Sequence, residues 1–136
     1  MPSRAYLRRT IQQPVVDALR SGGQGRRIRD LVARIDKGEA KLITRGGHDW
    51  TDKMKPLAAA IESLAIASAW LDGEIVVMNE DGLPDFNALQ NAIDNAASEA
   101  IEYFVFDLPF HDGRDLRKVP LRARRAVLRT IVEANA

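Results

Sequence analysis

The stretch that decides the fold is Ser68–Phe86, "SAWLDGEIVVMNEDGLPDF", in which an apolar strand ends at the turn residues "NEDG". Two carboxylates, Asp72 and Glu74, interrupt this strand, although a buried polar group without a partner costs free energy. Residues two apart in a strand point to the same face of the sheet, so the two carboxylates lie together. Gly73 between them lets a ligand or another backbone approach closely. The stretch therefore predicts a strand whose two carboxylates are candidates for a functional site, although a "DGE" triplet is more often a turn.

The segments around this strand predict an α+β protein with a largely antiparallel sheet flanked by helices. The predicted strands cover residues 31–45, as a hairpin around the turn "DKGE", and then residues 69–78 and 101–108. The predicted helices span residues 52–65, 84–96 and 120–134, and the predicted loops span residues 46–52 and 109–115.

The two later helices carry more specific signals. Asp85 is a plausible N-cap for the helix over residues 84–96. The helix over residues 120–134 is expected to turn its apolar side chains inward and its arginines outward. The inward set is Leu121, Val127, Leu128 and Ile131.

Length and composition favour one modest domain. The chain has 136 residues, with no cysteine for disulfides or thiolate metal sites. It shows neither a membrane-spanning apolar run nor a secretory leader, so a cytoplasmic location is the default expectation. Residues 1–30 hold seven arginines and two aspartates, and residues 114–129 hold seven basic residues and one aspartate. These basic ends are compatible with contact to a polyanion or with solvated surface.

Few residues point to chemistry by themselves. The chain lacks GxxxxGK[ST] and GxGxxG phosphate loops, and we interpret His48 and His111, each beside an aspartate, as turn residues. The oxygen-rich pair Asp72 and Glu74 could hold Mg²⁺ or accept hydrogen bonds from ribose hydroxyls. In "YFVFDL" strict alternation puts Tyr103, Val105 and Asp107 on one face and Phe104, Phe106 and Leu108 on the other, and an aromatic at a strand end can stack a nucleobase.

Four phrases in order resemble one family. "KLITRGGHDWTDK", "AWLDGEIVV", "DFNALQNA" and "YFVFDLPFHDGRDLRKVPLRARR" resemble the adenylation (nucleotidyltransferase) domain of ATP-dependent DNA ligases, above all the bacterial ligase D type, from about residue 31 to residue 131. The resemblance implies that Glu74 contacts the ribose or a catalytic divalent metal and that Asp72 supports it. It also implies that Phe106 stacks on adenine and that Arg45 binds phosphate of the nucleotide or of nicked DNA. ATP and Mg²⁺ are the implied cofactors.

The partners implied by the resemblance are nicked or broken double-stranded DNA and end-joining proteins, with no membrane. RNA ligases and mRNA-capping guanylyltransferases share the chemistry, but "TRGGHDWT" and "HDGRDLR" favour a DNA ligase. The family forms a lysyl-AMP on a KxDGxR lysine, passes AMP to a 5′-phosphate and seals the nick.

That lysine is missing from its expected place near Gly25, where the sequence reads "GQGRRIRD", and no lysine precedes Lys37. Lys37 and Lys41 lie outside the motif, and the later EGxxxK and KxK phrases and the oligonucleotide-binding-fold domain are also absent. We therefore expect an aberrant or poorly ordered segment over residues 1–30 and a partial adenylation domain over residues 31–136, with no catalytic residue. One hypothesis for the missing lysine is a frameshift in the gene. Codons can be chosen for Gln24–Arg29 that, when read one base later, encode Lys-Ala-Asp-Gly-Tyr, which matches the missing motif.

Three interpretations of function stay open at this point. The chain is an inactive fragment of a ligase, or a non-catalytic remnant that binds nucleotide or DNA, or a fragment without a stable fold because missing strands leave a sheet edge bare. In the second interpretation a basic helix contacts the DNA backbone, whereas the alternative leaves its arginines in water. The arginines concerned are Arg122, Arg124, Arg125 and Arg129.

Overall fold

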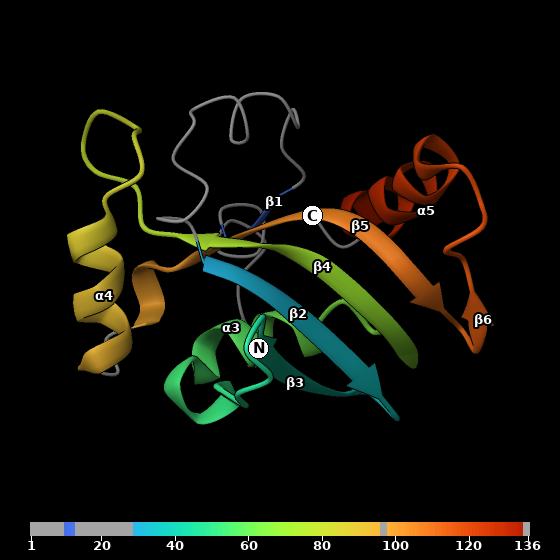
Figure 1. Ribbon diagram of the computed structural model, residues 1–136, viewed down its shortest axis with the longest axis horizontal. Coiled ribbons are helices and arrows are strands. Elements are labelled where there is room, and N and C mark those ends of the chain that lie inside the picture. Colours follow the sequence, from blue (N-terminus) through green and yellow to red (C-terminus); the bar gives the residue numbers. More distant parts are fainter. Residues whose placement is uncertain (1–9, 13–28, 96–97, 135–136) are drawn as a thin grey trace.

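The computed structural model describes residues 10–12, 29–95 and 98–134. It confirms the α+β prediction and the predicted order of the main elements (Figure 1). Most of the Gln24–Arg29 stretch behind the frameshift hypothesis lies outside the described residues. The strands are β1 (Ile11–Gln12), β2 (Arg29–Asp36), β3 (Glu39–Thr44), β4 (Ser68–Val76), β5 (Glu102–His111) and β6 (Arg114–Asp115). The helices are α3 (Lys55–Glu62), α4 (Phe86–Asp94) and α5 (Leu121–Ala134), with 3₁₀ turns η2 (Thr51–Lys53) and η3 (Ser98–Ala100).

The strands form one sheet in the order β1-β5-β4-β2-β3, and β6 pairs with β5. All neighbours are antiparallel except β1, which pairs in parallel with β5. The predicted hairpin joins β2 and β3 through Lys37 and Gly38, both with positive φ, as a two-residue hairpin turn requires. Two strand segments therefore fall within residues 1–30, since β1 lies there and β2 begins at Arg29.

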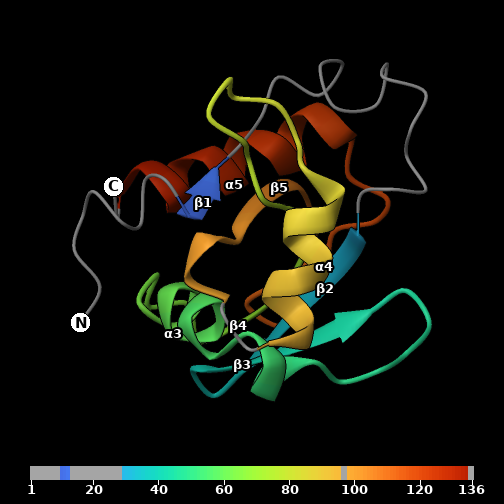
Figure 2. The same cartoon turned by 90° about the vertical axis from the view of Figure 1, so that its left-hand side faces the viewer.

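One face of the sheet carries the main hydrophobic core, and we call it the core face. Alternate residues of β2 and β4 supply it, among them Leu31, Ala33, Leu71 and Ile75, all nearly inaccessible to solvent. Helices α3, α4 and α5 add their apolar residues to the same cluster. Figure 2 shows α3 and α4 in front of the sheet with α5 behind them. The side chain of Asp85 accepts a hydrogen bond from the Ala88 amide at 3.0 Å, which confirms the predicted N-cap of α4.

The opposite face carries most of the polar residues of these strands, and we call it the pocket face. The β2–β4 register pairs its residues across the strands: Asp30 with Glu74, Val32 with Asp72, and Arg34 with Trp70. Asp72 and Glu74 therefore share a face, as the sequence predicts.

Gly73 is explained by the core face rather than by a ligand. A Cβ at this position would collide with the backbone carbonyl of Phe104 and come within 2.9 Å of the Tyr103 ring. The Tyr103 ring takes that space, and its hydroxyl lies 2.7 Å from the Leu31 carbonyl oxygen and 3.0 Å from that of Leu71. The sequence predicts that either a ligand or another backbone approaches this glycine. In the structure the backbone of β5 and the Tyr103 ring approach it.

Strand β3 is the last strand of the sheet, but its edge is not bare. Each amide on the outer side of the strand donates to a nearby group that is not another strand. These bonds remove the β3 edge as a reason to expect an unstable fragment. The pairs are Ala40 N–H with Glu62 Oε2 (2.9 Å), Leu42 N–H with Thr51 Oγ1 (3.0 Å) and Thr44 N–H with the His48 carbonyl (2.9 Å).

Two predictions near the C-terminal end were wrong. Residues 109–115 are not a loop, because β5 runs to His111 and turns through Asp112 and Gly113, both with positive φ, into β6. In α5 only Leu128 is fully buried, whereas Leu121 and Val127 are 42% and 40% exposed. Helix α5 packs mainly along β5, so its buried stripe is narrower than the apolar spacing indicates.

Candidate functional site

A pocket of about 310 Å³ opens on the pocket face between the ends of β2 and β3 and the middle of β4 and β5. Three of the four residues expected to bind ATP line it: Arg45, Asp72 and Phe106. They come from three separate segments of the chain, and only the sheet brings them together. The remaining lining residues, Asp30, Leu31, Val32 and Thr44, come from β2 and the end of β3.

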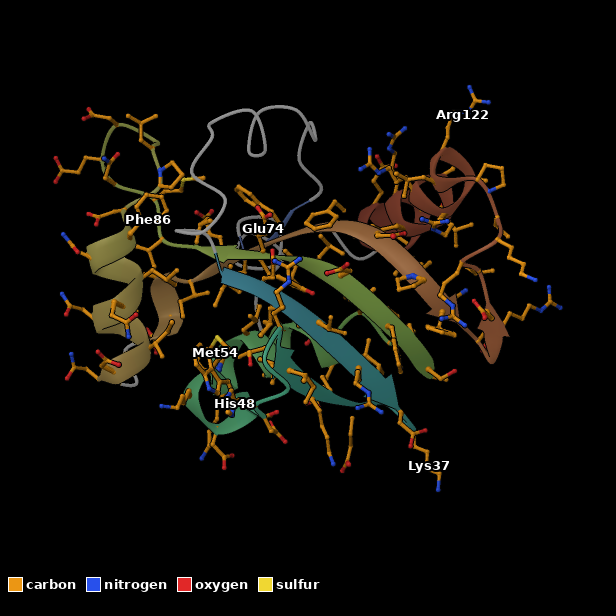
Figure 3. All side chains as sticks on the ribbon, viewed as in Figure 1. Lys37, His48, Met54, Glu74, Phe86 and Arg122 are labelled. Atoms are coloured by element: carbon orange, nitrogen blue, oxygen red, sulfur yellow. The ribbon has the colours of Figure 1, made fainter. Side chains whose placement is uncertain are left out.

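Glu74, the fourth expected residue, lies beside this pocket and does not line it. It is 7% exposed, and its neighbours across the sheet are Asp30 on β2 and Phe104 on β5. Figure 3 shows Glu74 on the sheet, well away from Lys37 at the hairpin tip. A residue two positions along β4 from Asp72 on the same face can reach a ligand that fills the pocket and extends past it.

Arg45 forms an ion pair with Asp30, with 3.1 Å between Nη1 and Oδ2. The Arg45 side chain is 86% exposed and that of Asp30 30% exposed, so the pair contributes little stability. The guanidinium can therefore exchange this carboxylate for a phosphate at low cost. Asp30 was missed from sequence because the predicted strand began after it, although the alternation Asp30, Val32, Arg34 marks it as a residue of the same face.

Phe106 lies on the pocket face with Phe104, as alternation predicts, but β5 departs from strict alternation directly after it. The pairing of β4 with β5 shifts register twice, between Trp70 and Asp72 and again between Asp72 and Gly73. Leu108 consequently joins Tyr103 in the main core, and the prediction that Asp107 shares the core face was wrong. Phe106 is 8% exposed at the pocket wall. Bulges of this kind reorient side chains in sheets.

Two arginines of α5 bind β5 instead of pointing outward. Arg124 Nε and Nη2 donate to the two carboxylate oxygens of Asp107 at 2.8 and 3.1 Å. This bond raises the pKa of Arg124 above its already high value. Arg125 Nε donates to the Phe106 carbonyl at 3.0 Å. The predicted outward orientation is therefore wrong for Arg124 and Arg125, whereas Arg122 and Arg129 are exposed. Figure 3 shows Arg122 pointing away from the sheet.

A second surface on the pocket face was not predicted from sequence. Trp70 and Phe110 pack edge to face, with 4.5 Å between ring centroids, and Arg34 lies 5.0 Å from the Trp70 centroid. Arg117 lies 5.0 Å from the Phe110 centroid, and its guanidinium bonds lower the pKa of Asp115 to about 2. An adjoining pocket of about 330 Å³ includes Trp70, Phe110 and His111. No local motif marked this arrangement, since its members come from β2, β4, β5 and the segment after β6.

The carboxylates of the pocket face suit a hard cation. Asp30, Asp72 and Glu74 offer oxygen atoms on neighbouring strands, and Mg²⁺ is commonly held by one or two carboxylates together with substrate phosphates. Among the described residues no group of three or more Asp, Glu, His or Cys side chains is arranged to hold a metal ion. Asp72 and Glu74 are oxygen donors on one face that could hold Mg²⁺ only together with a bound phosphate or water.

The pocket lining that the structure describes contains no lysine. Lys37 sits at the tip of the β2–β3 hairpin, and Lys41 lies opposite Arg34 on β3. Neither is placed where it could replace a nucleophile at the pocket. No helix within the described residues has both the length and the apolar character to cross a membrane.

Comparisons with known proteins agree with these features. A family described as the ATP dependent DNA ligase domain matches residues 24–136. The multifunctional non-homologous end joining protein LigD of Pseudomonas aeruginosa is 50% identical over 105 residues, covering 77% of this chain and 12% of that protein. The LigD DNA repair protein of Mycobacterium tuberculosis is 35% identical over 106 residues, covering 78% and 14%. A solved structure of mycobacterial DNA ligase D complexed with ATP and MES aligns with a TM-score of 0.67 at 34% identity, covering 78% and 34%.

Proposed function

Because the chain belongs to the ATP-dependent DNA ligase family, we propose that its pocket face binds the adenine nucleotide of a ligase reaction. The observation that carries the proposal is the single pocket that gathers Arg45, Asp72 and Phe106 from separate segments. The chain spans 12% of its Pseudomonas relative, so the activity of a whole ligase is proposed for the complete protein only. Residues 31–136 are, in this proposal, part of an adenylation domain.

Each wall of the pocket has a part in the proposal. Phe106 stacks on the adenine ring, since an aromatic face accepts any planar base. Arg45 exchanges Asp30 for a phosphate oxygen, a charge-assisted bond that a guanidinium makes well. Asp72 and Glu74 accept hydrogen bonds from the ribose hydroxyls. The order along the sheet, with Phe106 opposite Arg45 across the pocket, gives a nucleotide one orientation.

Mg²⁺ is the proposed metal, and Glu74 is the residue that would hold it. When bound beside a nucleotide, the metal neutralises phosphate charge that would otherwise repel an attacking group. Glu74 is buried on the same face as Asp72, so its carboxylate is already desolvated at a fixed place. No other described residue is assigned to the metal.

Covalent chemistry is not proposed for these 136 residues. Formation of lysyl-AMP needs an amine that attacks the α-phosphate of ATP while pyrophosphate leaves. No lysine precedes Lys37, and neither Lys37 nor Lys41 lines the pocket. The proposed partner of a complete ligase is nicked or broken double-stranded DNA, with end-joining proteins as companions. In this chain the same pocket binds the nucleotide without transferring it.

Titration of the chain with ATP and with inorganic tripolyphosphate tests the proposal. We expect ATP to bind about tenfold tighter, because stacking adds about 1–3 kcal/mol per base. The substitution Arg45→Gln should lower the affinity for both ligands, since it removes the phosphate contact. Incubation with ATP labelled at the α-phosphate should leave no label on the protein after denaturation. Equal affinity for the two ligands, or a covalent label, would contradict the proposal.

A further inference from the structure

We infer that Arg124 and Arg125 are positioning residues that hold Phe106 in the pocket by fixing the bulge of β5. This inference rests on the proposed function for the identity of the ligand, but its geometry is independent of any ligand. It also changes the interpretation of the basic helix. Two of the four arginines predicted to contact DNA, Arg124 and Arg125, instead bind β5 next to the nucleotide pocket.

The first step is the register of β5. Asp72 pairs with Asp107 and the next residue, Gly73, pairs with Val105, so Phe106 is an additional residue between two consecutive pairs. Without the bulge, the register set by Asp72 and Asp107 would continue and pair Phe106 with Gly73, which would turn the Phe106 ring to the core face. The extra residue lets Val105 and Leu108 both enter the core while Phe106 lines the pocket. The orientation of Phe106 therefore depends on the bulge.

The second step is the ion pair behind the bulge. Arg124 binds both oxygens of Asp107, and its Nη1 also donates to the carbonyls of Val119 at 2.6 Å and Arg117 at 3.2 Å. The side chains of Arg124 and Asp107 are only 14% and 20% exposed. A two-pronged pair at this depth is geometrically specific, and removing one partner leaves the other charge poorly solvated. Arg124 thus links β5 to the segment before α5.

The third step is the backbone of the bulge itself. Arg125 Nε donates to the carbonyl of Phe106, the additional residue, at 3.0 Å. Asp107 Oδ1 also accepts a hydrogen bond from the Leu108 amide at 2.7 Å, next to the Arg124 contact. Helix α5 therefore fixes the backbone on both sides of the peptide that joins Phe106 to Asp107. These contacts resist a slip of one residue that would turn the Phe106 ring away from the pocket.

The experiment compares Arg124→Gln with Arg122→Gln, an exposed arginine of the same helix, in the 136-residue chain. One measurement is nuclear Overhauser contact between the Phe106 ring and the methyl groups of Val32, which line the same pocket. The other is the ratio of ATP to tripolyphosphate affinity. Arg124→Gln should abolish the contact and lower the ATP affinity about tenfold, with tripolyphosphate affinity unchanged. Arg122→Gln should change neither.

Two further variants keep the test decisive. Arg124→Lys retains the charge without the two-pronged geometry, so it should restore only part of the contact. If Arg124→Gln does not fold, Arg125→Gln decides, because it removes one hydrogen bond to the Phe106 carbonyl and should weaken the same contact. Unchanged contact and unchanged affinity ratio in the folded variants overturn the inference. Loss of the contact in a protein that never prefers ATP supports the inference and refutes the proposed function.

Discussion

The two faces of β4 carry residues chosen for different reasons. On the core face Leu71, Gly73 and Ile75 are buried, and Gly73 is required because Tyr103 occupies the space of its side chain. On the pocket face Trp70 is 38% exposed and Asp72 is half-buried in a pocket wall. Packing in the core explains the first set, whereas Trp70 packs at the surface with Phe110 and Arg34, and Asp72 lines the pocket. Substitutions on the core face should therefore change stability, and substitutions on the pocket face should change binding.

The largest effect is expected for Gly73→Ala. Its Cβ would meet the Phe104 carbonyl and the Tyr103 ring, so we expect a loss of about 3 kcal/mol in the free energy of unfolding. Urea denaturation measures this loss. Gly82→Ala is the control, because a Cβ there meets nothing within 4 Å and only its positive φ opposes the change. Equal losses at the two glycines would show that close packing is not the reason for Gly73.

Tyr103→Phe should cost about 2 kcal/mol, because the carbonyls of Leu31 and Leu71 lose their buried donor. Burial, and next the charge of Asp72, raises the pKa of Tyr103 well above its usual range. An unfolded tyrosine ionises near about pH 10. Stability due to the buried neutral phenol is thus fully present below that pH and falls as the pH rises toward the folded pKa.

The measurement is the urea midpoint of both proteins between pH 8 and pH 11. The wild-type midpoint should fall more steeply above pH 10 than that of Tyr103→Phe, so the difference between them narrows. Parallel curves for the two proteins would mean that Tyr103 ionises equally in the folded and unfolded chains.

On the pocket face, Phe106→Leu should lower ATP affinity by about 1–2 kcal/mol, the free energy of stacking on a base. The apolar volume is largely kept, so the cost in folding should stay under about 1.5 kcal/mol. Phe104→Leu is the matched control on the same strand, since Phe104 packs against Val76 in a separate buried cluster. Fluorescence titration with ATP gives both affinities. A larger loss of ATP affinity in Phe104→Leu than in Phe106→Leu would mean that Phe104, and not Phe106, stacks on the base.

The smallest effect is expected for Arg122→Gln on the exposed side of α5. If Arg122 contacts a phosphate, the slope of log affinity against log salt for nicked duplex DNA should fall by about one. Fluorescence anisotropy between low and moderate salt measures the slope. Lys37→Gln at the tip of the β2–β3 hairpin is the control. An unchanged slope in Arg122→Gln would leave this arginine as solvated surface.

The sequence was informative where the structure depends on neighbours in the chain. The β2–β3 hairpin, the Asp85 N-cap and the shared face of Asp72 and Glu74 follow from local periodicity and turn chemistry. The β5–β6 hairpin was missed because residues 109–115 were interpreted as a loop, although "HDGR" holds the Asp-Gly turn signal. In the structure Pro109 lies within β5, and its carbonyl accepts a hydrogen bond from the Leu116 amide at 2.8 Å.

The bulge of β5 could not be predicted from alternation. Whether a strand gains a residue depends on the strand beside it and on the helix behind it, and here Arg124 and Arg125 decide. The same contacts show why the prediction that all arginines of α5 point outward was wrong. A helical wheel shows which residues share a side but cannot show an acidic partner such as Asp107 on another element. The structure brings the predicted residues Arg45, Asp72 and Phe106 to one pocket, together with Asp30, which was not predicted.

The covered edge of β3 has a consequence for the order of folding. The partners of its three outer amides all lie within residues 44–62, so the sequence separations of these bonds are short. Contacts between residues near in sequence form early, because little chain entropy is lost in closing the loop. We expect residues 29–62 to gather into a hairpin with its own helix during synthesis, before β4 leaves the ribosome. Strand β4 then pairs with β2 of this hairpin, while the outer edge of β3 is already hydrogen-bonded and cannot pair with a strand of another chain.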